Sequence, residues 1–468
     1  MTQRWTRRSF LGAMGAAGAV GATGLGLGEA RAQVPAPADG HRFLIVIGAA
    51  GGASIVDGPL AIPASTSGSA DAINTFPDQV VSRPGGSPFS AVDMRRDELG
   101  QIPVGFTANQ SRFVAAHHQD MMVTTWTRTS VNHAIGQRRA VTGNEAWLGR
   151  TLQECVAWQY GADFPLPNVH LSTGTGYTDR GTDRSLPSYC YGEVVADPLL
   201  WPLGLDSAKG LPGAPAPGLL ARARALRDGT LDPRSRFAKV FGESPKLQHW
   251  QQIRGGTRER VEALGLIDKL LMMPESRDRP LSEYGLQASS DVARLREVFP
   301  NYDRDPLESQ AALAFLLLKN RVSCTVTLVP TGSVVLLGEG ANRLADDTIT
   351  NPPLAFDFSH QGHRSTQSLM WHRMYVVMGG LIRLLREVEY GGGQSMWDRT
   401  MIYLGSDFGR EKRRPAGADE WGTSHDLNNG VLVVSPLVNG GRCWGVDAET
   451  GMTYGFDPRT GSRSGSRT

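Results

Sequence analysis

Several motifs that would fix a function directly are absent from this 468-residue sequence. There is no Gly-x-Ser-x-Gly segment and no Walker phosphate loop, which removes the nucleophile turn of α/β-hydrolases and the P-loop nucleotide site. The four cysteines form no Cys-x-x-Cys pair, which argues against a zinc finger or a thioredoxin-like site. They leave open either one or two disulfides or buried free thiols.

The chain also lacks a strong charge of either sign. Its formal net charge is +2, and four arginines against one glutamate lie in residues 1–32, so the remainder carries about −1. A near-neutral chain gives no electrostatic case for binding nucleic acid or a membrane surface. We therefore expect no nucleic-acid partner.

The N-terminus predicts export. Arg7 and Arg8 precede an uncharged stretch rich in glycine, alanine and leucine, and Ala30 and Ala32 form a small-x-small cleavage site. We interpret residues 1–32 as a twin-arginine signal peptide, recognised by the Tat translocase, for a periplasmic or extracellular protein. Its apolar stretch is too rich in glycine to prefer lipid, and no cysteine follows the cleavage site, so we expect no stable membrane anchor.

Short apolar runs alternate with helical patterns after a Pro/Ala linker at residues 33–40. Residues 43–47 form an unbroken apolar run, typical of a strand buried on both faces of a parallel sheet. Further strand patterns cover residues 121–126, 324–329, 401–404 and 431–434, and helical patterns cover residues 144–160, 308–319 and 365–389. The alternation predicts an α/β fold: a three-layer sandwich with a mostly parallel central sheet.

The stretch from about residue 202 to 300 differs in composition. It is charged and helical without a convincing strand, which predicts a helical insertion in a single domain spanning residues 33–458. The tail 459–468, made largely of Gly, Ser, Arg and Thr, is expected to be disordered.

Candidate site residues follow the predicted strands, because ligands of open α/β sheets bind beyond the carboxyl ends of the strands. Gly51 and Gly52 come after the first strand and place Ser54 at that edge. Asp407 and Arg410 follow the strand that ends near residue 404, a combination suited to a metal ion and an anionic substrate. A plain turn after the first strand and local pairing of Asp407 and Arg410 are the alternatives.

Imidazoles and carboxylates gather late in the chain. Asp357, His360 and His363 lie within seven residues, and His425 stands just before the last predicted strand. This donor set predicts a divalent metal site. His133 follows the strand that ends at residue 126 and could reach the same edge, although a structural histidine is the simpler interpretation.

The order of these motifs resembles an exported, sulfatase-like bacterial family of unknown function in the alkaline phosphatase superfamily. The matching features are the twin-arginine signal, Gly-Gly-x-Ser after the first strand, and a histidine segment that leads to Thr-Gly. An Asp-x-His-type loop before a long helix, a Glu/Asp-Phe-Gly-Arg strand end and a Gly-x-Asp-His segment follow in the family. They lie at Gly51–Ser54, His133–Gly143, Asp357–His363, Asp407–Arg410 and Gly422–His425.

The resemblance implies an alkaline phosphatase-like fold and metal-dependent hydrolysis of small anionic phosphate or sulfate esters. Asp357, one of His360 and His363, and His425 would bind one ion, of zinc, manganese, magnesium or calcium. Asp407 would belong to a second metal site, with Ser54 in the nucleophile region. Arg410 remains the candidate for holding an anionic substrate, from its position beside Asp407.

The sequence departs from that pattern at several positions. Hydrolytic members have an aspartate after the first strand, where this chain has Ala49 and Ala50, and Ser424 replaces the carboxylate beside the last histidine. Phe408 stands where a histidine or asparagine ligand is expected, so the second metal site lacks ligands. No Cys-x-Pro-x-Arg motif is present, which argues against a formylglycine nucleophile.

Three functions follow from these observations. The first is a metal-dependent ester hydrolase, and the second is a non-catalytic exported binding or assembly protein on the same fold. The third, a redox-partnered exported protein, has the least support, because no haem, dinucleotide or iron–sulfur spacing occurs.

Overall fold

The computed structural model describes most of the chain beyond residue 39. The described ranges are 40–66, 73–94, 108–127, 129–145, 147–205, 215–244, 247–248, 251, 264–330, 334–335, 348–349, 355–457 and 459–467. The predicted signal peptide at residues 1–32 and all but the last residue of the predicted linker lie outside them. The structure therefore bears on the fold and the candidate site, and the export signal stays a sequence prediction.

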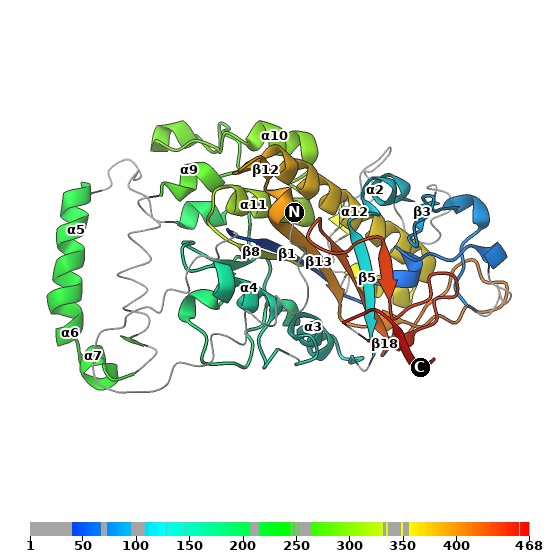
Figure 1. Ribbon diagram of the computed structural model, residues 1–468. Coiled ribbons are helices and arrows are strands. Elements are labelled where there is room, and N and C mark those ends of the chain that lie inside the picture. Colours follow the sequence, from blue (N-terminus) through cyan, green and yellow to red (C-terminus); the bar gives the residue numbers. More distant parts are fainter. Residues whose placement is uncertain are drawn as a thin grey trace. The chain divides into compact units, whose positions relative to one another are not determined.

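The centre of the fold is an eight-stranded, mostly parallel sheet (Figure 1). Its strand order is β17-β5-β16-β13-β1-β8-β6-β7, and only β16 runs antiparallel to its neighbours. The bounds are β1 Phe43–Ala49, β5 Met121–Trp126, β6 Asn168–His170, β7 Glu193–Val194, β8 Thr325–Leu328, β13 Thr400–Ser406, β16 Asn429–Val434 and β17 Arg442–Trp444. The predicted α/β sandwich is confirmed.

Strand β1 lies in the middle of the sheet because its sequence allows it. All seven of its residues are buried, and it pairs in parallel with β13 on one side and β8 on the other. An apolar run without polar alternation is stable only where helices cover both faces of the sheet.

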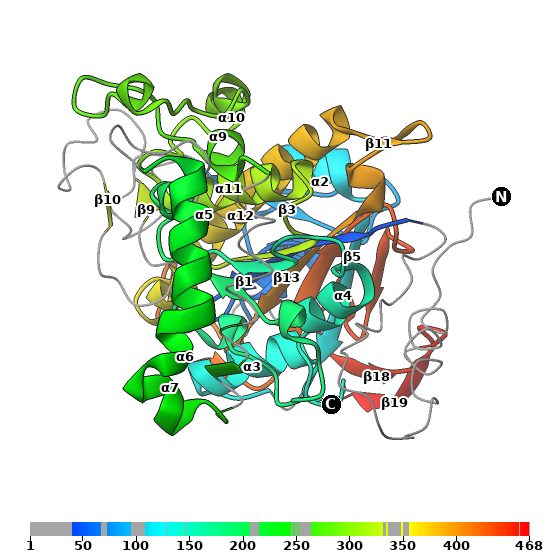
Figure 2. The same ribbon diagram turned by 90° about the vertical axis from the view of Figure 1, so that its left-hand side faces the viewer.

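Helices form the two outer layers (Figures 1 and 2). Helices α3 (His133–Thr142) and α4 (Leu152–Tyr160) lie on one face, and α11 (Pro306–Lys319) and α12 (His363–Glu387) lie on the other. The predicted helices at 308–319 and 365–389 correspond to α11 and α12. The helix predicted from residue 144 begins only at Leu152, since the preceding turn contains residues with positive φ, among them Asn144 and Leu148.

Residues 196–303 form a compact unit of their own, close to the predicted insertion at residues 202–300. Its described elements include the helices α5 (Pro217–Leu226), α6 (Asp232–Arg234), α7 (Arg236–Phe241), α9 (Leu266–Leu270) and α10 (Val292–Val298). A small apolar core holds this unit together; its buried members are Ile267, Leu271, Met273 and Leu281.

In the tail, for which the composition predicts disorder, residues Arg463–Arg467 form strand β19, which pairs with β18 (Tyr454–Phe456). The four cysteines are free thiols, and Cys155, Cys190 and Cys324 are buried. The sequence left open disulfides or buried free thiols, and the structure has free thiols. None of the helices in the described ranges has the length and apolarity needed to cross a membrane.

Candidate metal centre

Three short segments bring imidazoles and a carboxylate to the carboxyl edge of β1 and β13. His133 is the first residue of α3, which begins there because the Asn132 side chain accepts a hydrogen bond from the backbone N–H of Ile135. Asp357 and His360 lie in the 3₁₀ turn η13 (Ala355–His360), directly before α12. His425 lies in the two-residue strand β15 (His425–Asp426), which pairs with β14 (Gly409–Arg410).

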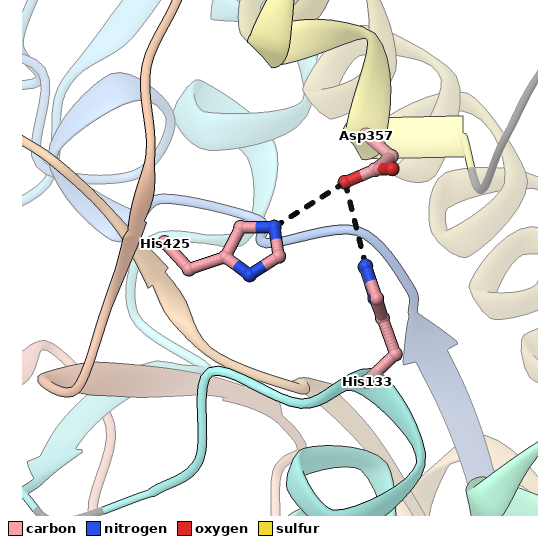
Figure 3. A group of neighbouring side chains, drawn as sticks. All are labelled: His133, Asp357 and His425. Carbon is pink, nitrogen blue, oxygen red and sulfur yellow. Dashed lines mark ion pairs between the residues drawn. The ribbon is translucent and has the colours of Figure 1, made fainter.

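Two of the histidines point at one carboxylate oxygen (Figure 3). The Nε2 atoms of His133 and His425 each lie 3.7 Å from Oδ1 of Asp357, and the three ligand atoms lie within 4.8 Å of one another. In a tetrahedral zinc site with bonds of about 2.1 Å, neighbouring ligand atoms are about 3.4 Å apart. His133, Asp357 and His425 therefore form a cluster that could hold a metal ion.

His360 borders this cluster. Its Nε2 lies 3.4 Å from Oδ1 of Asp357 and 2.9 Å from Nε2 of His425. Its side chain is 44% exposed, against 32% for His133 and 18% for His425. The three imidazoles thus lie on the solvent-accessible side of Asp357.

The other ring nitrogens of His133 and His425 are held by acceptors. Nδ1 of His425 lies 2.8 Å from the carbonyl oxygen of Val131, and Nδ1 of His133 lies 2.8 Å from Oδ2 of Asp407. Both acceptors fix a proton on Nδ1, so that the lone pair is on Nε2, the atom that faces Asp357. Phe408 stacks on the His425 ring at a centroid distance of 3.8 Å and further restricts its orientation.

Asp407 lies behind His133 and receives several hydrogen bonds. Its carboxylate accepts from the backbone N–H groups of Gly51 and Gly52, at 3.1 and 2.8 Å, and from the Ser406 hydroxyl. Its side chain is fully buried. The structure therefore places Asp407 as the outer partner of His133, whereas the resemblance implied that it would bind a second metal ion.

Arg410 anchors Asp357 from inside the protein. Its side chain is fully buried, and Nη2 donates to Oδ1 of Asp357 at 2.7 Å. Nε and Nη1 donate to the carbonyl oxygens of Gly51 and Thr423, both at 3.1 Å. The guanidinium predicted to hold a substrate is instead used within the fold, where it joins the first loop, η13 and the His425 loop.

Gly51 must be a glycine for this packing. Its φ is +94°, and a Cβ atom would lie 2.3 Å from the backbone nitrogen of Asp357. No other residue type fits, because both the backbone conformation and the space exclude a side chain. The glycines after β1 thus allow close approach of η13 and donate to Asp407.

The electrostatic surroundings shift the pKa values of the three histidines in different directions. Burial lowers the pKa of His425 and of His360, and Arg410 adds to that effect. The hydrogen bond to Asp407 raises the pKa of His133 despite partial burial. Near neutral pH the rings of His425 and His360 are therefore neutral and able to bind a cation.

The donor set fits a zinc-type ion. Two imidazoles with fixed tautomers and one carboxylate, each with an outer hydrogen-bond partner, are typical of catalytic zinc sites. Calcium and magnesium prefer oxygen ligands, which this cluster does not supply in sufficient number. In the described part of the chain, no second group of three or more His, Cys, Asp or Glu residues has this geometry.

The remaining predicted residues lie away from the cluster. His363 is fully buried at the start of α12, with Nδ1 2.8 Å from the Thr423 hydroxyl and Nε2 3.1 Å from Oδ2 of Asp57. Of the two alternatives His360 and His363, the structure therefore brings His360 to Asp357.

Ser54 is buried at the N-terminal side of a 3₁₀ turn. Its backbone N–H donates to Gln367, and its carbonyl accepts from the indole of Trp371, both on α12. These contacts fix the Ser54 backbone against α12, and neither involves the Ser54 hydroxyl. A role for Ser54 in the nucleophile region stays a prediction from the resemblance.

His133 is the residue whose importance the sequence interpretation underestimated. Its position after β5 had suggested that it reaches the same edge, but a lone histidine carries little weight. Its place in the cluster depends on α3 packing against β13: a Cβ on Gly136 would lie 2.3 Å from the carbonyl oxygen of Asp407. That contact between distant segments is not visible in the sequence.

Comparison with known proteins adds little. Neither a protein family nor a curated protein matches the chain. Among solved structures, Ps i-CgsB in complex with k-i-k-neocarrahexaose matches with 13% identity and a TM-score of 0.23, over 86% of this chain and 68% of that chain. A TM-score this low carries no argument, so the site must be judged on its own geometry.

Proposed function

We propose that this protein binds one divalent metal ion of the zinc type at His133, Asp357 and His425, and uses it to hydrolyse phosphate or sulfate esters. The observation that carries the proposal is the approach of both Nε2 atoms to Oδ1 of Asp357 at the spacing of metal ligands. The site is at the carboxyl edge of a mostly parallel sheet, where α/β proteins bind substrates. The resemblance to exported sulfatase-like proteins supplies the substrate class.

Each residue has a defined task in this proposal. His425 presents a neutral Nε2 atom, and His133 would release its Nε2 proton when the ion binds. Asp407 and the Val131 carbonyl orient the two rings, and Arg410 holds Asp357 in place. An ion bound by three protein ligands keeps a position for substrate, and it would act as a Lewis acid and make water a nucleophile near neutral pH. No serine nucleophile is then required.

A second candidate function is a non-catalytic binding or assembly protein in which the ion is structural. The proximity of His360 to both Asp357 and His425 favours it, because a fourth protein ligand would close the coordination shell. The burial of Arg410 also favours it, since this guanidinium pairs with Asp357 inside the fold, and the described residues hold no second cluster of metal-ligating side chains.

The two functions are separated by measuring metal content and turnover on the same samples. We expect one zinc per chain by elemental analysis, and zinc-dependent release of 4-nitrophenol from 4-nitrophenyl phosphate or sulfate. His425→Ala should abolish both, whereas His118→Ala, beyond the last turn of α2 (Ser111–His117), should change neither. Protein that binds no divalent ion contradicts the proposal; protein that binds one ion but cleaves neither ester supports the structural role.

His360→Ala provides a further distinction. If His360 is a fourth ligand, the variant should lose zinc affinity, and an ester hydrolase activity should appear or rise as the shell opens. If the site is already open, zinc affinity should change by less than about threefold, below the effect expected for loss of an outer partner.

Export through the twin-arginine route is part of the same proposal. We expect the protein in the periplasm or outside the cell, with residues 1–32 removed. Replacement of Arg7 and Arg8 together by lysine should retain it in the cytoplasm at full length. Unchanged fractionation of that variant would contradict the export proposal without bearing on the metal site.

A further inference from the structure

The unit formed by residues 196–303 contains a helical segment that contributes nothing to a core. Helix α5, a π-helical turn at Arg227–Leu231, α6 and α7 follow one another along residues 217–241 (Figure 2). We call this stretch the exposed helical segment. None of its described side chains is buried, and the core of the unit uses residues outside it.

Large apolar side chains are nevertheless frequent in the exposed helical segment. Leu219 is 60% exposed, Phe237 60% and Val240 66%, and Phe237 contacts Phe241 through ring packing at 5.0 Å. The full set of exposed large apolar residues here is Leu219, Leu226, Leu231, Phe237, Val240 and Phe241. Helices in water gain most of their stability by covering an apolar face, and exposed apolar patches of this kind mark interaction surfaces.

Basic side chains accompany the apolar ones. Residues 217–241 contain six Arg or Lys and two Asp or Glu, a net charge of +4, whereas the whole chain carries only +2. Arg222 lies three residues after Leu219 and four before Leu226, so it borders the same face of α5. In α7, Arg236 and Lys239 alternate with Phe237 and Val240 in the same way.

We propose that the exposed helical segment lies on the surface of an anionic lipid bilayer. Leucine and phenylalanine side chains would enter the boundary between headgroups and acyl chains, and the neighbouring arginines would contact lipid phosphates. The long basic side chains allow their charged ends to stay at the headgroups while their aliphatic parts contact apolar surface. Such peripheral contact involves no spanning helix and no stable anchor.

Charge favours a lipid surface over a second copy of the chain. A symmetric dimer through this face would place the same patch on both sides, and two segments of +4 each would repel. An anionic surface would instead attract the exposed basic groups of the segment, among them Arg222 and Arg236. The proposal is independent of the metal centre.

Vesicle co-sedimentation tests the proposal. The purified full chain, and separately the chain without residues 1–32, is mixed with vesicles of neutral phosphatidylcholine or of phosphatidylcholine with 30% phosphatidylglycerol. We expect at least about tenfold stronger binding to the anionic vesicles, reversed in 0.5 M NaCl. Phe237→Ser/Val240→Ser/Phe241→Ser and Arg222→Glu/Arg236→Glu should each remove the binding without changing the melting temperature, because these side chains are not buried.

Matched controls are Val376→Ser and Arg383→Glu, two exposed positions on α12. Equal binding of wild type to neutral and anionic vesicles, or no binding to either, overturns the proposal. So does an apolar triple variant that binds like wild type. A wild-type dimer in light scattering that the same triple variant converts to monomer would overturn it in favour of self-association.

Discussion

Replacement of Asp407 by asparagine should weaken the proposed metal site without removing a ligand. The carboxylate accepts hydrogen bonds from Gly51, Gly52, Ser406 and His133, and the shortest two are 2.8 Å. An amide keeps the shape but presents an NH₂ group to donors on one side. The His133 ring then loses the acceptor that fixes its proton on Nδ1.

The size of the effect follows from known losses of outer-shell partners, which reduce metal affinity by about 10- to 100-fold, or about 1.4–2.7 kcal/mol. The folded state should lose about 2–3 kcal/mol as well, since one charge-assisted hydrogen bond to a buried group is removed. Zinc affinity is measured by competition with a chromophoric chelator, and stability by urea unfolding of the metal-free protein.

Asp447→Asn is the matched control, because Asp447 caps a surface turn through Glu449 and Thr450. It should leave zinc affinity unchanged. If Asp407→Asn bound zinc as tightly as wild type, His133 would not depend on Asp407, and the assignment of the pair as ligand and outer partner would be refuted.

Three further predictions concern charge in the buried parts of the fold. Arg410→Met should lower the free energy of unfolding of the metal-free protein by about 3–5 kcal/mol, because Asp357 loses a buried partner. Added zinc should restore part of that free energy. A change below about 1 kcal/mol in urea unfolding would contradict this prediction. Zinc affinity should fall about tenfold per pH unit below the raised pKa of His133, since binding displaces its proton, and a pH-independent affinity from pH 5 to 8 would exclude His133 as a ligand. Burial lowers the pKa of His170 in β6 to about 4, so the unfolded chain binds a proton more readily than the folded one. The free energy of unfolding should therefore fall by about 3 kcal/mol as the pH drops from about 6.5 to about 4. His170→Asn should lack that decline in urea unfolding.

The sequence determined the layered architecture because its strongest signals are local. The run at residues 43–47 has no polar alternation, and it became the central strand β1 with every residue buried. Residues 121–126 became β5 with the predicted bounds, and α11 and α12 follow the helical patterns. Three-residue and two-residue strands such as β6 and β7 were not predicted, since so few residues show no periodicity.

The site was determined only in part by the sequence. The density of Asp357, His360, His363 and His425 in the last third of the chain predicted a metal-binding cluster. The structure brings Asp357, His360 and His425 together, and His363 lies apart from them against Asp57. The tertiary structure alone decided that His133 joins them, that Asp407 stands behind His133, and that Arg410 is buried under Asp357. Those roles depend on the direction in which each side chain points once β1, β13 and α3 have packed together. Residue spacing along the sequence does not determine that direction.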